Sequence, residues 1–193
     1  MDDHHKLGNG SFGSVYKADN PTGDSSHVAV KMINMAFLGR DISKNELLPA
    51  EKELNHPNTI KIIKAHRDYE SRMLWIVMEY CQDPLHKYLA YIETEGPKFD
   101  QRKAIVLQTA LGIEYLHSKG IAHRDLKPDN VMIKEVTTFP LVKVTDFSFA
   151  RDLSEEVTSY MSTVRGNPMW LAPELLDVNG NYKPKALANY TRA

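Results

Sequence analysis

Several features are scarce in this chain, and each scarcity excludes a class of protein. Among 193 residues there is one cysteine, Cys81, so no intramolecular disulfide can form, and this fits a reducing compartment. No apolar run is long enough to span a bilayer, and residues 1–6 do not read as a signal peptide. We therefore expect an intracellular, cytoplasmic protein without a membrane partner.

Charge of one sign is not in excess either. The chain has 24 Lys and Arg against 25 Asp and Glu, a net charge of −1, so we expect no nucleic-acid partner. Internal repeats and low-complexity tracts are absent from the sequence. With 42% hydrophobic and 25% charged residues, the composition is typical of one globular domain or a small two-lobed one, and it leaves the oligomeric state open.

The most informative stretch is residues 121–130, which reads IAHRDLKPDN. Phosphoryl transfer requires the groups that it gathers: a carboxylate to deprotonate a hydroxyl, a cation for phosphate charge and an amide oxygen for a metal. The stretch resembles the catalytic loop H-R-D-x-x-x-x-N of the eukaryotic protein kinases, in its serine/threonine version. The resemblance implies that Asp125 is the catalytic base, that Lys127 supports the transferring phosphate, and that Asn130 binds Mg²⁺.

Three spaced glycines, Gly8, Gly10 and Gly13, allow the backbone to approach phosphates closely. The same spacing occurs in dinucleotide-binding turns, where a helix follows the last glycine. Here residues 15–17 continue as a strand, which favours a strand–loop–strand hairpin. The hairpin resembles the kinase glycine-rich loop and implies that these glycines bind ATP.

Residues 28–31 read as an alternating strand that ends in a lysine, and they resemble the V-A-I-K element of kinases. The resemblance implies that Lys31 pairs with the α- and β-phosphates of ATP and takes part in catalysis. It also implies that Leu7, Val15 and Ala29 line the ATP site.

A regulatory helix is expected over Ser43–Asn55, carrying a glutamate to Lys31. Two candidates compete, Glu46 and Glu51. Pro49 within the segment indicates that a continuous helix starts near it, which favours Glu51.

Two further strands are expected, at Thr59–Ile63 and at Leu74–Glu79. The second is almost entirely apolar and is therefore expected at the centre of a sheet. It resembles the segment that leads into the kinase hinge. The resemblance implies that Met78 is the gatekeeper and that the backbone of Glu79 and Cys81 binds adenine.

Beyond the hinge, which we expect to end at residues 83–84, helices are predicted over Leu85–Ile92 and Asp100–Ser118. In the longer helix Asp100 is the expected N-cap, and Gly120 the stop. Its expected apolar face consists of Ile105, Leu107, Leu111 and Leu116.

Residues 146–148 read D-F-S and align with the D-F-G element, which implies that Asp146 binds Mg²⁺. Ser148 replaces the glycine and should narrow the available backbone conformations. D-F-S also resembles the testis-specific serine kinase group. Further on, Thr163 is the expected activating phosphorylation site, with Ser159 and Ser162 as alternatives, and a phosphate there would pair with Arg124.

The resemblance implies an α+β, bilobal protein-kinase-like fold over residues 1–193. We expect a β-rich N-lobe at 1–80 with one regulatory helix, a hinge at 81–84, and an incomplete, mostly α-helical C-lobe at 85–193. After residues 172–174 (A-P-E) the family pattern is soon lost, so we expect a C-terminally truncated domain with an exposed apolar patch and poor solubility.

Two functions follow. The first is an ATP- and Mg²⁺-dependent serine/threonine kinase acting on a protein substrate. The second is a catalytically weak or inactive nucleotide-binding fragment that acts as a binding module; Ser148 and Asn167, where kinases usually have glycine and threonine, favour it. A small-molecule phosphotransferase is a third reading, which the A-P-E segment disfavours.

Overall fold

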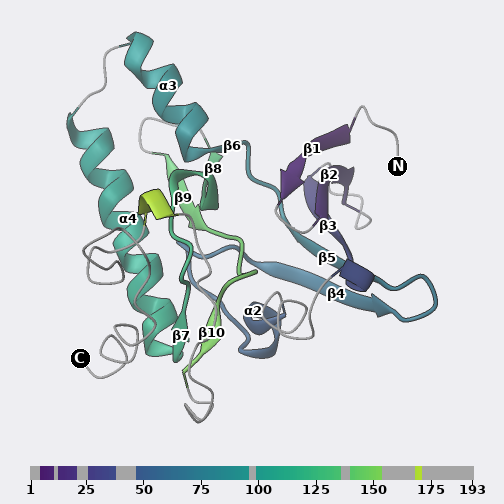
Figure 1. Cartoon of the computed structure of the whole chain (residues 1–193). Helices are drawn as coiled ribbons and strands as arrows, with labels where there is room; N and C mark the ends of the chain where they lie inside the picture. Colours follow the sequence, from purple (N-terminus) through teal and green to yellow (C-terminus); the bar gives the residue numbers. More distant parts are fainter. Residues whose placement is uncertain are drawn as a thin grey trace.

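The computed structural model describes residues 5–10, 13–20, 26–37, 47–95, 99–135, 140–153 and 168–170 (Figure 1). Its largest sheet has five antiparallel strands in the order β1-β2-β3-β5-β4. Because β2 and not a helix follows the glycines, the strand–loop–strand prediction is confirmed. The strands are β1 (Lys6–Gly10), β2 (Gly13–Asp19), β3 (His27–Asn34), β4 (Ile62–Asp68) and β5 (Met73–Glu79).

The apolar strand β5 lies between β3 and β4, so its predicted central place is confirmed. Lys31 does not end its strand as predicted. Strand β3 continues to Asn34, because residues 32–34 still pair with residues 73–75 of β5. Lys31 is therefore held in the middle of a strand that has neighbours on both sides.

The strand predicted at Thr59–Ile63 is displaced, because β4 begins only at Ile62 and runs to Asp68. The residues before it pair elsewhere. The amide of Ile60 donates to the carbonyl of Val144 at 2.9 Å, and the amide of Val144 donates to the carbonyl of Asn58 at 2.9 Å. This short parallel pairing joins the chain ahead of the large sheet to β9 (Leu141–Val144).

The predicted regulatory helix is only partly described. Helix α2 (Leu48–Glu51) begins beside Pro49, as expected, but it stops well before Asn55. Glu53 takes a left-handed conformation with φ 49°, which ends the helix. Glu46 and the side chain of Glu51 lie outside the described part of the structure, so the choice between them stays a prediction.

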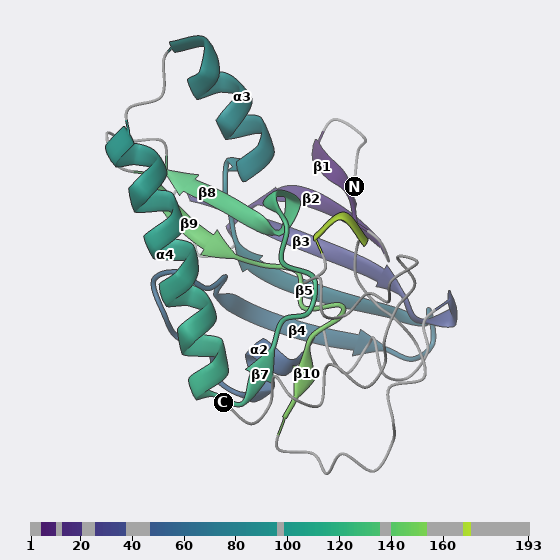
Figure 2. The same cartoon turned by 60° about the vertical axis from the view of Figure 1, so that its left-hand side comes forward.

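A second, three-stranded sheet has the order β6-β8-β9, and a third sheet pairs β10 with β7. Figures 1 and 2 show the two long helices on one side of the molecule, with β8 and β9 between α4 and the large sheet. In the described part, no helix combines the length and apolar character needed to cross a membrane. The elements are β6 (Asp83–Pro84), α3 (Leu85–Glu95), α4 (Phe99–Ser118), β7 (Ile121–Ala122), η3 (Pro128–Asn130), β8 (Val131–Glu135) and β10 (Arg151–Asp152). The described residues also form two further short 3₁₀ turns, η2 (Met35–Phe37) and η4 (Pro168–Trp170).

Both predicted helices are confirmed, although α4 starts at Phe99, so Asp100 lies in its first turn and is not the N-cap. Gly120 ends α4 with φ 71°, as predicted. The predicted apolar face is wrong in part. Ile105 and Leu116 are buried, but Leu107 and Leu111 are exposed by 56% and 40%.

The buried face of α4 instead includes Gly112. A Cβ atom there would collide with the carbonyl of Asn58 and crowd Val144, so the helix packs closely against the segment that pairs with β9. A search for apolar side chains passes over a glycine, although a missing side chain is what permits this close approach.

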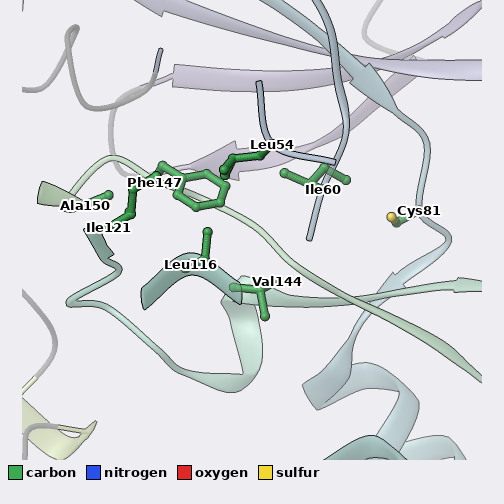
Figure 3. Packing of buried hydrophobic residues seen from close by; sticks show 8 residues of the cluster. All are labelled: Leu54, Ile60, Cys81, Leu116, Ile121, Val144, Phe147 and Ala150. Atoms are coloured by element: carbon green, nitrogen blue, oxygen red, sulfur yellow. The ribbon is translucent and has the colours of Figure 1, made fainter. Parts of the chain in front are cut away.

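The main core lies where the three sheets and α4 meet (Figure 3). Phe147, which is 2% exposed, lies among side chains from α4, β7 and β9. The aromatic residue of the D-F-S motif thus anchors its neighbours to the core. The cluster consists of Leu54, Ile60, Cys81, Leu116, Ile121, Val144, Phe147 and Ala150.

Candidate functional site

A cavity of about 530 Å³ is lined by residues of β1, β2, β3 and β5 on one side and by residues of α3, η3 and β8 on another. Its size suits a small-molecule ligand. Most of the residues predicted for the site line it: Leu7, Gly8, Val15, Ala29, Lys31, Met78, Glu79, Cys81, Lys127, Asn130 and Asp146. Residues more than 100 positions apart in the sequence therefore line the same cavity.

Lys31 and Asp146 form an ion pair at the cavity wall. Nζ of Lys31 lies 3.0 Å from Oδ1 of Asp146, and the side chains are 6% and 18% exposed. Burial raises the pKa of Asp146, but the Lys31 ammonium and hydrogen bonds from Ser148 outweigh it and lower this pKa to about 2. The carboxylate is therefore ionised at neutral pH, and a cation can bind to it.

Asp125 is bonded to the two other polar residues of its loop. Oδ2 of Asp125 accepts from Nζ of Lys127 and from Nδ2 of Asn130, both at 2.9 Å. Nδ2 of Asn130 also donates to the Asp125 carbonyl at 2.7 Å. Both N–H groups of the amide are thus used, which leaves the amide oxygen of Asn130 as the atom to accept a metal.

His123 joins the backbone at Asp125 to the backbone at Thr145. Its Nε2 lies 2.8 Å from the Thr145 carbonyl, and its Nδ1 lies 3.3 Å from the Asp125 amide. Burial lowers the pKa of His123 more than the hydrogen bond with the Thr145 carbonyl and the charges of Asp146 and Asp125 raise it. A neutral ring that donates at Nε2 and accepts at Nδ1 satisfies both contacts, so it ties Asp125 to the residue before Asp146.

The backbone is strained on both sides of this histidine link. Arg124 has φ 65° and Asp146 has φ 61°, values that residues other than glycine adopt rarely. Strain of this kind persists where the surrounding contacts impose it, and it clusters at functional sites. Arg124 is held by its Nε, which donates to the Phe149 carbonyl at 2.6 Å.

Glu79, at the end of β5, directs its carboxylate to two lysines. Oε1 lies 2.8 Å from Nζ of Lys143, and Oε2 lies 2.8 Å from Nζ of Lys134. Burial raises the pKa of Glu79, but these two lysines and the Lys61 amide outweigh it and lower the pKa. The ion pairs fix the segment in which the adenine contacts are predicted.

Two predicted residues that the structure describes, Gly13 and Asp125, are not among those that line the cavity. The surroundings of Gly10 and the side chain of Glu51 lie outside the described part. Asp125 lies behind the cavity wall, bonded to two residues that do line it. Gly13 has a packing role, since a Cβ atom there would collide with the Met32 carbonyl on β3. A Cβ atom added at Gly8 would meet nothing within 4 Å, so there is open space on that side of the residue. Thr163, Ser159, Ser162 and Asn167 lie outside the described residues.

Sequence reasoning missed several lining residues and the contacts of one hydroxyl group. Ile76 could have been found, because it precedes Met78 by two positions on β5 and faces the same side. The hydrogen bonds of the Ser148 hydroxyl had no signal in the sequence. The other missed lining residues are Asn9, Ile60, Ile62, Pro84, His86, Lys87, Asp129, Met132, Thr145 and Phe147.

The residues present fit a magnesium ion that is shared with phosphates. Within the described ranges, no group of three or more His, Cys, Asp or Glu could hold a metal unaided. Magnesium, however, is commonly bound by one or two protein oxygens together with substrate phosphates. Asp146 and Asn130 offer one oxygen each at the same cavity.

Comparison with known proteins assigns the family. The protein kinase domain model matches residues 1–187, and the chain therefore belongs to the protein kinase family. The sheet-rich N-terminal part and the helices that follow it are compatible with this fold.

Curated relatives are serine/threonine-protein kinases. TOS3 of Saccharomyces cerevisiae is 30% identical over 200 residues, which cover 91% of this chain and 35% of the relative. The protein named fused of Drosophila melanogaster is 37% identical over 173 residues, with coverages of 88% and 20%. For shk2 of Schizosaccharomyces pombe the identity is 35% over 180 residues, with coverages of 91% and 29%. The chain thus spans between 20% and 35% of the length of these relatives.

Proposed function

We propose that this chain is a serine/threonine protein kinase domain that transfers the γ-phosphate of ATP to a serine or threonine hydroxyl of a protein. The single observation that carries the proposal is the arrangement of Lys31, Asp146, Asn130 and Lys127 around one cavity, with Asp125 bonded to the last two. The names of the curated relatives support the serine/threonine class.

Lys31 would bind the α- and β-phosphates. It is 5% exposed and lies within a central strand, so few orientations of its side chain are available. Asp146 and Asn130 would hold Mg²⁺ through their oxygens. When bound, Mg²⁺ would neutralise charge on the phosphates.

Asp125 would take the proton from the substrate hydroxyl. Two bonds to Oδ2, from Lys127 and Asn130, fix the orientation of this carboxylate. Lys127 lies on the cavity side of Asp125 and would move its ammonium between the base and the transferring phosphate. A positioned base of this kind contributes roughly 10²–10⁴-fold to the rate.

The adenine ring would occupy the part of the cavity that Leu7, Val15, Ala29 and Met78 line. The backbone of Glu79 and Cys81 would bind its polar edge, and a glutamate of the α2 region would support Lys31. The domain division remains a prediction, with lobes at 1–80 and 85–193 and a hinge at 81–84. Three other predictions also remain: the likeness to testis-specific kinases, the cytoplasmic location, and the absence of nucleic-acid and membrane partners.

A binding module without turnover is the second candidate. One observation favours it: Oδ1 of Asp146, the residue proposed to bind metal, already accepts bonds from Lys31 and Ser148. If these contacts persist when nucleotide binds, then metal binding, and with it transfer, would be weak.

Replacing Asp125 with Asn distinguishes the two candidates. In the kinase, Asp125→Asn lowers transfer to serine- and threonine-containing peptides by about 10²-fold or more, while ATP affinity measured by calorimetry stays within about twofold. Asp100→Asn, in the exposed first turn of α4, is the matched control and leaves both values unchanged. A wild-type chain that binds ATP without transferring phosphate would favour the binding module. A chain that does not bind ATP would contradict both candidates.

A further inference from the structure

The hydroxyl of Ser148 makes buried contacts that no sequence pattern predicts. The residue is 1% exposed. Its Oγ lies 2.5 Å from Oδ1 of Asp146 and 3.3 Å from Nζ of Lys31. The Ser148 amide also donates to Oδ1, at 3.4 Å.

The direction of these hydrogen bonds follows from the chemistry of the three groups. A lysine ammonium only donates, and an ionised carboxylate only accepts. Oγ of Ser148 therefore accepts from Lys31 and donates its own hydrogen to Asp146. Lys31 also donates directly to Oδ1, so the three residues form a closed triangle of bonds.

All three bonds that the described residues donate to the Asp146 carboxylate end on Oδ1. Oδ2 receives none of them. A carboxylate held at one oxygen from two directions cannot rotate without breaking a charge-assisted hydrogen bond. The contacts thus distinguish the two oxygens of a group that is otherwise symmetric.

We propose that Ser148 is a positioning residue, whose hydroxyl orients the Asp146 carboxylate so that Oδ2 is presented to the metal. The inference rests on the proposed function, because it needs Asp146 to bind Mg²⁺. Glycine at position 148 could supply the backbone amide but not the hydroxyl. Partners that orient a metal-binding carboxylate typically change metal affinity by 10–100-fold when they are removed.

The test is a Mg²⁺ titration of nucleotide binding, with a fluorescent ATP analogue as probe. In Ser148→Ala we expect the half-saturating Mg²⁺ concentration to rise about tenfold. The affinity for the analogue in EDTA should stay within about twofold, since the hydroxyl does not act through the nucleotide itself. A residue with a merely structural role would change both values together or neither.

Two further variants make the result specific. Ser148→Gly keeps the amide and loses the hydroxyl, so it should show the same increase in Mg²⁺ requirement. Ser118→Ala is the matched control, because it removes a serine hydroxyl that donates to the Tyr115 carbonyl at the end of α4, away from the cavity. It should leave the titration unchanged. Thermal unfolding checks that each variant is folded.

The inference would be overturned if wild-type protein binds the ATP analogue with Mg²⁺ and Ser148→Ala needs no more Mg²⁺ than wild type. The proposed function would then stay intact. Wild-type protein that binds no nucleotide at any Mg²⁺ concentration would instead overturn the proposed function, and the inference with it.

Discussion

Oε1 of Glu79 lies 2.8 Å from Nζ of Lys143, and this ion pair joins the last residue of β5 to β9. The side chains are 11% and 7% exposed, so both charges are largely removed from water. The pair connects the large sheet to the smaller one at the edge of the cavity.

Removing one member of this pair should destabilise the fold. In Glu79→Gln the ammonium of Lys143 stays buried without its counter-charge, and the usual cost of such a change is about 3–5 kcal/mol. Urea denaturation followed by circular dichroism measures it. The double variant Glu79→Gln/Lys143→Met should lose less than the sum of the single changes. Lys134→Met, at a lysine that is 33% exposed, is the milder control. Strictly additive losses would contradict a coupled pair.

Cys81 should be nearly inert to alkylation in the folded protein. Burial, with a smaller contribution from the Glu79 charge, raises the pKa of its thiol to about 12, and only the thiolate reacts. Compared with an ordinary cysteine pKa of about 8.5, the thiolate fraction at neutral pH falls on the order of 10³-fold. Iodoacetamide labelling followed by intact mass tests this, with urea-denatured protein as the reference. Equal labelling rates in the two states would contradict the buried position.

Gly112→Ala should destabilise the protein although it places a better helix former in α4. The gain in helix propensity is about 1 kcal/mol. The new Cβ, however, would collide with the Asn58 carbonyl and crowd Val144, and overpacking costs about 1–3 kcal/mol. A lower urea midpoint is expected. Leu107→Ala, at a helix position that is 56% exposed, should change stability by less than about 0.5 kcal/mol. A more stable Gly112→Ala protein would show that the helix is not packed as closely as described.

Acid should destabilise the fold through His123. Burial lowers its pKa in the folded state, so below the ordinary histidine pKa of about 6.5 the unfolded chain binds more protons than the folded one. Stability is therefore fully present above this pH and falls as the pH drops below it. In His123→Phe the slope of stability against pH between 7 and 5.5 should become shallower.

His56 should preserve part of the dependence of stability on pH when His123 is replaced. Burial also lowers its pKa, so it keeps part of the dependence in the His123→Phe protein. His117→Gln, at an exposed position, is the control and should keep the wild-type slope. An unchanged slope in His123→Phe would show that the His123 ring does not cause the loss of stability between pH 7 and 5.5.

Much of the candidate site was predictable because its residues lie in short, ordered patterns. The loop with Asp125, Lys127 and Asn130 is local in sequence, and its polar groups do bond to one another. The glycine hairpin was predicted for a similar reason, since strand alternation and turn residues are local signals. Lys31 and Asp146 are 115 positions apart, and only the resemblance to a family predicted that they lie at the same site.

The wrong predictions concern features that depend on contacts between residues far apart in the sequence. Residues 58–60 have strand character, but they pair with β9 instead of extending β4. Leu107 and Leu111 are as apolar as Leu116, yet only the last faces the core, because the close approach at Gly112 sets the rotation of α4. Lys31 was expected at a strand end, and pairing with β5 extends the strand beyond it.

The available chemical groups and the local elements that carry them follow from the amino-acid sequence alone, because turn chemistry, strand alternation and helix period depend on neighbours along the chain. Which of these groups contact one another depends on how distant segments pack together. Ser148 is a small polar residue in the sequence. Its hydroxyl donates a hydrogen bond to Asp146 because Phe147 is held in the core and Lys31 is held in a central strand. The polar groups of Ser148, Asp146 and Lys31 therefore share one buried space, where polar groups are normally hydrogen-bonded.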